Sequence, residues 1–340
     1  MEADARHETM DAALPRAGSA PAALARFLGD MARIRRVEFL VAEIPIVAIP
    51  LLLAARDPGE ILRAPIARGI ALFFLLFNFG DMINCLADRD LDALYKTHLS
   101  RSVYRLGVRF VAIQVAACAL LALALATHLS LLLGHPVIVV LVVLGLLQGA
   151  AYSVEPVRLK RRGPLGLLCL WLIIFVGPMM LVSTLLRPWP PPAVVLVACA
   201  YGALQMGIIL VNTAEDFAED LASGVRTTIV VLGLPRGIGL ALGLVLAGGA
   251  GLLGTLASLA AARHVPAAAW ASLALPAAAI AVAARGVNAL RVRIFRAESD
   301  RAVLEVKRSA RWVPLWVTLV AWTTLAASMV LFVSGGGATR

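Results

Sequence analysis

Two segments of the chain combine asparagine and aspartate at one spacing, N-x3-D-x3-D. The first is "NCLADRDLD" (Asn84, Asp88, Asp92), and the second is "NTAEDFAED" (Asn212, Asp216, Asp220). On a helix, residues four positions apart project from one face, with a drift of about 40° per step. Mg²⁺ prefers oxygen ligands and is usually held by one or two carboxylates together with substrate phosphates. We therefore predict that all six residues bind Mg²⁺ and that the two clusters grip one diphosphate.

Basic residues accompany both acidic segments and the stretch between them, "YSVEPVRLKRRG". Those expected to bind the diphosphate are Lys96, Arg101, Lys160, Arg161 and Arg226. Their side chains form charge-assisted hydrogen bonds with phosphate oxygens. Alone, such a basic run equally indicates membrane topology or a solvated loop. Beside the acidic clusters, we assign Lys160 a catalytic role with the four aspartates, and we expect Tyr152 to contact the prenyl chain or a cationic intermediate.

Other polar residues within apolar segments are weaker candidates. Asp81 lies on the same stripe as the first cluster, whereas Asp90 points away from it and is expected to orient neighbours. Glu43 is costly in lipid and is therefore a functional hypothesis. Three glutamines either shape a substrate pocket or form hydrogen bonds between helices; they are Gln114, Gln148 and Gln205.

The composition indicates a polytopic membrane protein with an all-α fold. Hydrophobic residues make up 61% of the 340-residue chain, charged residues make up 15%, and the mean hydropathy is +0.87. Continuously apolar stretches of ~20 residues predict membrane helices rather than the alternating strands of a barrel. We predict about nine spans in one bundle, over residues 37–55, 66–86, 108–127, 136–152, 164–186, 193–213, 237–262, 266–284 and 312–334.

The distribution of charge predicts the orientation and the membrane. Most of the 31 Lys and Arg residues fall in the N-terminal segment and in the loops after even-numbered spans. The positive-inside rule then places the N-terminus in the cytoplasm and the C-terminus outside. The net charge of +10 is explained by topology and by attraction to anionic lipid, which argues against nucleic-acid binding. The excess of Arg over Lys suggests a GC-rich bacterial genome and hence the bacterial cytoplasmic (inner) membrane.

The same reading divides the chain into four parts. Residues 1–20 have no apolar core and are expected to form a disordered tail without a cleavable signal peptide. Residues 21–36 place apolar side chains at helical spacing with arginines behind them, which predicts an interfacial amphipathic helix. Residues 37–334 form the transmembrane domain, and residues 335–340 form a C-terminal tail.

Three ordered motifs make the chain resemble the UbiA-type family of intramembrane prenyltransferases over nearly all of its length. They are "NCLADRDLD", "YSVEPVRLKR" and "DFAEDLASGVRT", the last matching the family's D-x3-D followed by G-x-[KR]-T. The resemblance implies nine helices, motif loops on the cytoplasmic side, and Mg²⁺-dependent transfer of a polyprenyl group. The donor is then a polyprenyl diphosphate held near membrane lipid. The acceptor is an aromatic compound, a quinone precursor, or a polar lipid or sugar phosphate.

Two other functions use the same residues. A membrane terpene cyclase would bind the same diphosphate at the same metal site and would need no acceptor. A cation-coupled transporter would contain two acidic repeats near the bilayer midplane. The acidic residues lie at span ends beside basic loops, which favours phosphate chemistry.

Overall fold

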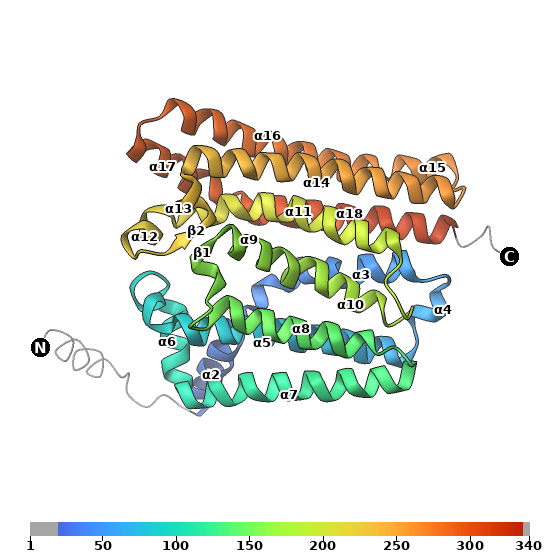
Figure 1. Cartoon of the computed structure of the whole chain (residues 1–340), viewed down its shortest axis with the longest axis horizontal. Coiled ribbons are helices and arrows are strands. Elements are labelled where there is room, and N and C mark those ends of the chain that lie inside the picture. Colours follow the sequence, from blue (N-terminus) through green and yellow to red (C-terminus); the bar gives the residue numbers. More distant parts are fainter. Residues whose placement is uncertain (1–19, 336–340) are drawn as a thin grey trace, which may run out of the picture.

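The computed structural model describes residues 20–335, and almost all of this part of the chain is helical (Figure 1). The first half contains α2 (Ala20–Ile34), the 3-10 helix η1 (Val37–Phe39), α3 (Leu40–Ala54), α4 (Pro58–Ile61), α5 (Ala64–Tyr95), α6 (Thr97–Leu106), α7 (Val108–Leu133) and α8 (Val137–Ser153). The second half contains the 3-10 helix η2 (Leu159–Arg161), α9 (Pro164–Leu170), the π-helix η3 (Trp171–Val176), α10 (Gly177–Ser183), α11 (Pro192–Glu215), α12 (Phe217–Ala222), α13 (Thr228–Leu232), α14 (Leu234–Ala262), α15 (Ala267–Ala271), α16 (Ala274–Arg296), α17 (Ser299–Ala310) and α18 (Val313–Gly335).

The predicted all-α class is confirmed, and the predicted number of spans is close. Within residues 20–335, eight helical segments are long and apolar enough to cross a membrane. The remaining predicted span, 136–152, corresponds to α8, which is apolar but has only 17 residues. Two helices extend well past the predicted ends, because their last turns are polar and lie beyond the apolar stretch: α5 continues to Tyr95 and α16 to Arg296.

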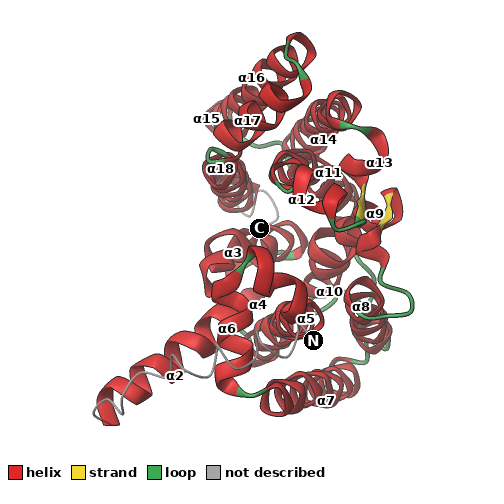
Figure 2. Ribbon diagram, turned by 90° about the vertical axis from the view of Figure 1, so that its left-hand side faces the viewer, coloured by secondary structure: helices red, strands yellow, loops and turns green. Residues whose placement is uncertain are grey.

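The long helices run along the long axis of the molecule, so the connecting segments gather at its two ends (Figure 1). One end carries α6, α12, α13 and α17, and the opposite end carries α4 and α15. The first end also carries both acidic motifs and the basic segment. Figure 2 shows that α2 extends away from the bundle at the edge formed by α6 and α7.

Glycines let the central helices α11 and α14 approach closely. A Cβ atom added at Gly248 would lie 2.4 Å from the backbone nitrogen of Leu204. One added at Gly207 would lie 2.6 Å from the carbonyl oxygen of Ala241. Small residues at helix interfaces allow such backbone contact in membrane proteins. This packing fixes α11, and α11 leads directly into the second acidic motif.

The structure describes only some of the four parts into which the sequence divides the chain. Most of both predicted tails, residues 1–20 and 335–340, lies outside the described residues. The segment predicted as an interfacial helix, 21–36, is helical over Ala20–Ile34. Its location at the membrane surface stays a prediction.

Candidate active site

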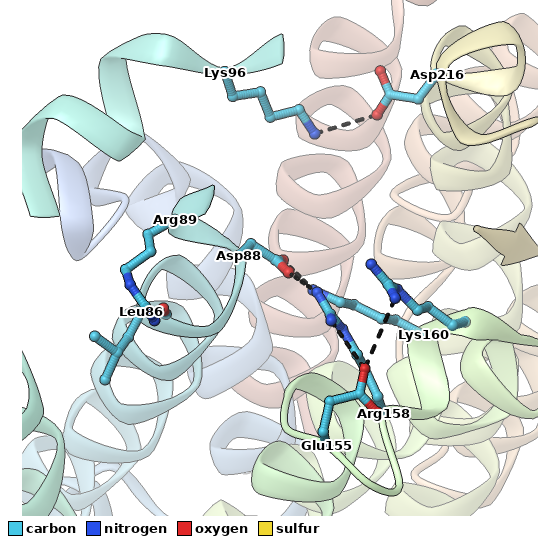
Figure 3. Close-up of polar contacts among 9 residues, drawn as sticks. Leu86, Asp88, Arg89, Lys96, Glu155, Arg158, Lys160 and Asp216 are labelled. Atoms are coloured by element: carbon cyan, nitrogen blue, oxygen red, sulfur yellow. Dashed lines mark hydrogen bonds and ion pairs between the residues drawn. The ribbon is translucent and has the colours of Figure 1, made fainter. Parts of the chain in front are cut away.

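The first acidic motif lies on an unbroken helix. Because α5 continues to Tyr95, the predicted stripe of Asn84, Asp88 and Asp92 is present, and all three residues are half-buried. Asp88 accepts a hydrogen bond from Arg158 Nη2 at 2.8 Å and a second from Lys160 Nζ (Figure 3). One carboxylate of the motif is therefore paired with two cations from the segment after α8.

The local fold of that segment directs both cations inward. Arg158 has a left-handed backbone conformation (φ 36°) immediately before η2, which contains Lys160. Arg158 also donates from Nη1 to Glu155 Oε1 at 3.0 Å, so Glu155 orients the guanidinium toward the motif. The segment ends in strand β1 (Arg162–Gly163), which pairs in parallel with β2 (Arg226–Thr227). This short ladder, which the all-helical prediction did not include, ties the basic segment to the end of the second motif.

Water is largely excluded from the paired charges. The side chains of Asp88, Arg158 and Lys160 are only 13–14% exposed. Burial lowers the pKa of Lys160, although the Asp88 carboxylate opposes that shift. In such a shielded place, charge–charge interactions are stronger than in bulk water. A phosphate that enters would compete with Asp88 for these two cations.

The second motif differs from the first because its helix is interrupted. Helix α11 ends at Glu215, Asp216 has a non-helical conformation (φ −83°, ψ 7°), and α12 begins at the next residue. Asp216 and Asp220 are half-buried, whereas Asn212 is exposed on α11. Burial raises the pKa of Asp220 to about 6, against the opposing effect of the Thr227 side chain. The break means that the three residues do not form one straight helical stripe.

Lys96 connects the two motifs across the site. Lys96 is the C-cap residue of α5, the helix of the first motif, and its Nζ donates to Asp216 Oδ2 at 3.2 Å (Figure 3). One residue earlier, the Tyr95 hydroxyl lies 3.2 Å from Ser223 Oγ at the end of α12. The end of α5 therefore contacts the segment of the second motif at two points.

Other predicted site residues lie further from these contacts. Arg161 approaches Glu155 Oε1 at 3.8 Å, and no contact joins it to Asp88. Arg101 and Arg226 are exposed at the same end of the molecule. Tyr152 is half-buried near the end of α8. The structure brings Lys96 and Lys160 into contact with the carboxylates, and the contact of the other four residues with a ligand stays a prediction.

Sequence reasoning missed Arg158 and Glu155. The consecutive residues Lys160, Arg161 and Arg162 dominate the basic run, so the separate arginine two positions earlier was not selected. Arg158 lies only two positions before Lys160, and this proximity to the basic run is the signal that the sequence contains. Its role depends on the left-handed turn at Arg158, which no local pattern in this non-glycine residue indicates.

The lesser polar candidates mostly form contacts between structural elements. Asp90 accepts a hydrogen bond from the Tyr104 hydroxyl of α6. Gln114 accepts one from Arg35 at 2.6 Å. Gln205 is fully buried and donates to the Val317 carbonyl oxygen at 3.2 Å, which is the interhelical alternative rather than a pocket role.

The oxygen atoms of the two motifs fit a Mg²⁺ ion whose remaining ligands come from a bound substrate. Among the side chains described in residues 21–298 and 301–335, no three His, Cys, Asp or Glu residues lie close enough to form a metal cage by themselves. The acidic side chains at this end supply only oxygen atoms, and they come from two separate helices. Mg²⁺ commonly keeps waters and takes few protein ligands when substrate phosphates supply the rest. The site therefore matches a metal–diphosphate complex better than a structural metal.

Comparisons with known proteins identify the family and the fold. A model of the UbiA prenyltransferase family matches residues 43–293. A solved structure from work on digeranylgeranylglyceryl phosphate synthase has a TM-score of 0.62 at 13% identity and covers 89% of this chain and 99% of that one. A UbiA homologue from Archaeoglobus fulgidus bound to GPP and Mg²⁺ has a TM-score of 0.60 at 16% identity, with coverage of 87% and 99%. Identities this low show the fold alone.

Curated relatives match a shorter stretch. The chloroplastic chlorophyll synthase of Oryza sativa subsp. japonica is 29% identical over 161 residues, which is 47% of this chain and 43% of the synthase. The Avena sativa chlorophyll synthase is 27% identical over 161 residues. The chain thus matches less than half the length of these relatives.

Proposed function

Because the chain belongs to the UbiA prenyltransferase family, we propose that it is a Mg²⁺-dependent membrane prenyltransferase. It moves a polyprenyl group from an allylic polyprenyl diphosphate to an acceptor and releases pyrophosphate. One observation carries this proposal: an aspartate of each acidic motif pairs with a lysine, Asp88 with Lys160 and Asp216 with Lys96. At the end of an apolar helical bundle, carboxylates paired with lysines that a phosphate could recruit suit a ligand with an anionic head and an apolar tail.

Different residues of the chain bind the metal, the phosphate oxygens and the prenyl chain. Asp88, Asp92, Asp216 and Asp220 would hold Mg²⁺, with the amides of Asn84 and Asn212 assisting. Bound Mg²⁺ neutralises charge on the departing pyrophosphate. Lys96, Arg101, Lys160, Arg161 and Arg226 would bind its phosphate oxygens, and Tyr152 would contact the prenyl chain or the allylic cation. To this predicted set we add Arg158, which shares Asp88 with Lys160.

Catalysis rests mainly on stabilising the leaving group. Cleavage of the C1–O bond sends the electron pair to pyrophosphate and leaves an allylic cation, which the acceptor then captures at C1. Before the donor binds, Asp88 holds Lys160 and Arg158 in place. A phosphate that enters would draw these two cations from the carboxylate, and Asp88 would then be available to hold Mg²⁺. Positioned charges in a site with little water need little reorganisation during the reaction.

The acceptor belongs to one of the classes that the sequence indicates: an aromatic compound, a quinone precursor, or a polar lipid or sugar phosphate. We propose further that the protein lies in a bacterial cytoplasmic membrane, with both motifs facing the cytoplasm. A terpene cyclase remains the alternative, because it needs the same diphosphate site. The transporter alternative is weakened because the acidic motifs lie at helix ends beside paired cations (Figures 1 and 3).

Product analysis tests the proposal. Purified protein is incubated with Mg²⁺ and geranylgeranyl diphosphate, with or without a lipid extract that supplies acceptors, and pyrophosphate and prenylated products are measured. A transferase releases pyrophosphate only when the extract is present. A cyclase releases it without the extract and forms a hydrocarbon. No pyrophosphate under either condition contradicts both enzymatic proposals, and an EDTA-treated sample serves as the control for metal dependence.

A further inference from the structure

A buried carboxylate joins α2 to α6. Asp30 of α2 is only 3% exposed and accepts a hydrogen bond from Ser102 Oγ of α6 at 2.7 Å. Arg33 Nη1 donates to the same oxygen at 2.9 Å, and Arg105 Nη1 lies 3.8 Å from it. A buried charge is costly unless it is paired and hydrogen-bonded. These three partners compensate Asp30, so α2 and α6 fit together in one arrangement.

Contacts with neighbouring helices hold helix α6 in position. It has ten residues, and its flanking residues Lys96 and Gly107 both have non-helical backbone conformations. Its apolar face, with Leu99 and Val103, is buried in a cluster that includes Ile34 of α2. The contact at Ser102 adds a directional bond to this apolar packing. Without it, α6 would keep its burial and lose a fixed orientation.

The orientation of α6 bears on the site because Lys96 is its N-cap residue. The backbone of Lys96 is held from one side by α5, where its N–H donates to the Asp92 carbonyl oxygen at 2.8 Å. On the other side, the N–H of Leu99 donates to the Lys96 carbonyl oxygen at 2.9 Å. The Lys96 side chain then spans the site to Asp216. A tilt of α6 therefore changes where Lys96 Nζ lies relative to both motifs.

Helix α2 is itself anchored to the bundle. Arg35 Nη2 donates to Gln114 Oε1 of α7 at 2.6 Å, and the Phe27 ring lies 6.1 Å from the ring of Phe110. Helix α2 is thus a fixed support, although it extends away from the main bundle (Figure 2). Among the described residues, no side chain of α2 forms a hydrogen bond or ion pair with the acidic motifs, although Ile34 also packs in a cluster with Met82 and Ile83 of α5. The polar partners of Asp30 itself lie on α2 and α6.

We infer that Asp30 is a positioning residue for diphosphate binding, because it fixes α6 against α2 and thereby holds Lys96 opposite Asp216. This inference rests on the proposed function, since Lys96 is assigned there to the diphosphate. The effect is specific to the head group of the donor. The prenyl tail binds among the spans, where Asp30 has no influence.

Calorimetry on the full chain in detergent tests this role with two ligands. Geranylgeranyl thiodiphosphate with Mg²⁺ reports head-group binding, and geranylgeraniol reports binding of the tail alone. Asp30→Asn should weaken thiodiphosphate binding about threefold to tenfold and leave geranylgeraniol binding unchanged. Hydrogen exchange of residues 97–106, measured without ligand, should become faster. Asp30→Asn removes the buried charge, whereas Ser102→Ala removes the hydroxyl that donates to Asp30. Ser102→Ala should act in the same direction, including where Asp30→Asn does not fold.

The control is Asp57→Asn, which removes the charge of another hydrogen-bonded aspartate, the acceptor of the Glu60 N–H at 3.1 Å, at the opposite end of the bundle. It should change neither thiodiphosphate affinity nor exchange in α6. Equal affinity in wild type and Asp30→Asn would overturn the inference, as would an equal loss for both ligands. Wild-type protein that does not bind the thiodiphosphate would instead refute the proposed function, and the exchange measurement would still report whether Asp30 holds α6.

Discussion

At the residue scale, the pairing of Asp88 with two cations explains how the site exists before ligand binds. Four aspartates close together would repel one another, and burial would increase that cost. Lys160 and Arg158 offset the charge at Asp88, and Lys96 offsets it at Asp216. The same side chains are those that a diphosphate needs. The ion pairs therefore keep the site compact and supply ligand-binding groups when the donor arrives.

The first prediction concerns the difference between neighbouring cations. Lys160 contacts Asp88, whereas the ion-pair partner of Arg161 is Glu155, at 3.8 Å. Lys160→Ala should weaken binding of geranylgeranyl thiodiphosphate by on the order of tenfold, or ~1.4 kcal/mol. Arg161→Ala, the matched control, should lose clearly less. Calorimetry in the presence of Mg²⁺ measures both, and equal losses would mean that the basic run acts through its overall charge.

At the element scale, the approach of α11 to α14 positions the second motif. At Gly248 only a hydrogen atom fits between the helices, because an added Cβ would lie 2.4 Å from backbone. Gly243, on the same helix, has no neighbouring atom within 4 Å of such a Cβ. The two glycines share a helix and differ only in packing.

This contrast gives a second prediction. Gly248→Ala should force α11 and α14 apart and lower the thermal unfolding temperature, at a cost of about 1–3 kcal/mol. Gly243→Ala should be neutral or stabilising, because alanine favours a helix over glycine by roughly 1 kcal/mol. Thermal unfolding in detergent, followed by tryptophan fluorescence, measures both variants. A stable Gly248→Ala protein would show that the close contact contributes little.

The elements also show how far sequence reasoning reaches. Long apolar runs predicted the helices because a span must satisfy its own backbone hydrogen bonds, and the i, i+4 spacing predicted the stripe on α5. The break at Asp216 was not predicted, because the second motif has the same letters as the first and no proline or glycine marks the interruption. The position of Arg158 and the β1–β2 ladder depend on contacts between segments far apart in the chain.

At the scale of the whole molecule, the gathering of both motifs and the basic segment at one end is the main architectural feature. The third prediction concerns which side of the membrane that end faces. Leu304 on α17 lies at the motif end and is 56% exposed, and Trp189 in the loop before α11 is 71% exposed at the opposite end. The positive-inside rule places the motif end in the cytoplasm.

Cysteine labelling in intact bacterial cells measures this orientation. A cysteine at position 189 (Trp189→Cys) should react with a membrane-impermeant thiol reagent. One at position 304 (Leu304→Cys) should react only after the cells are lysed. The unaltered chain, labelled in parallel, accounts for its own four cysteines. The reverse pattern would place the motifs outside the cell, away from a cytoplasmic supply of prenyl diphosphate.

The central claim is that the two acidic motifs bind one shared diphosphate through Mg²⁺. The most direct test is a double-mutant cycle, with Asp88→Asn, Asp216→Asn and the double variant, in which Mg²⁺-dependent binding of geranylgeranyl thiodiphosphate is measured by calorimetry. A shared site predicts that each single change removes most of the affinity and that the double change removes little more, because interacting residues are not additive. Near-wild-type binding in either single variant, or losses that simply add, would contradict the claim.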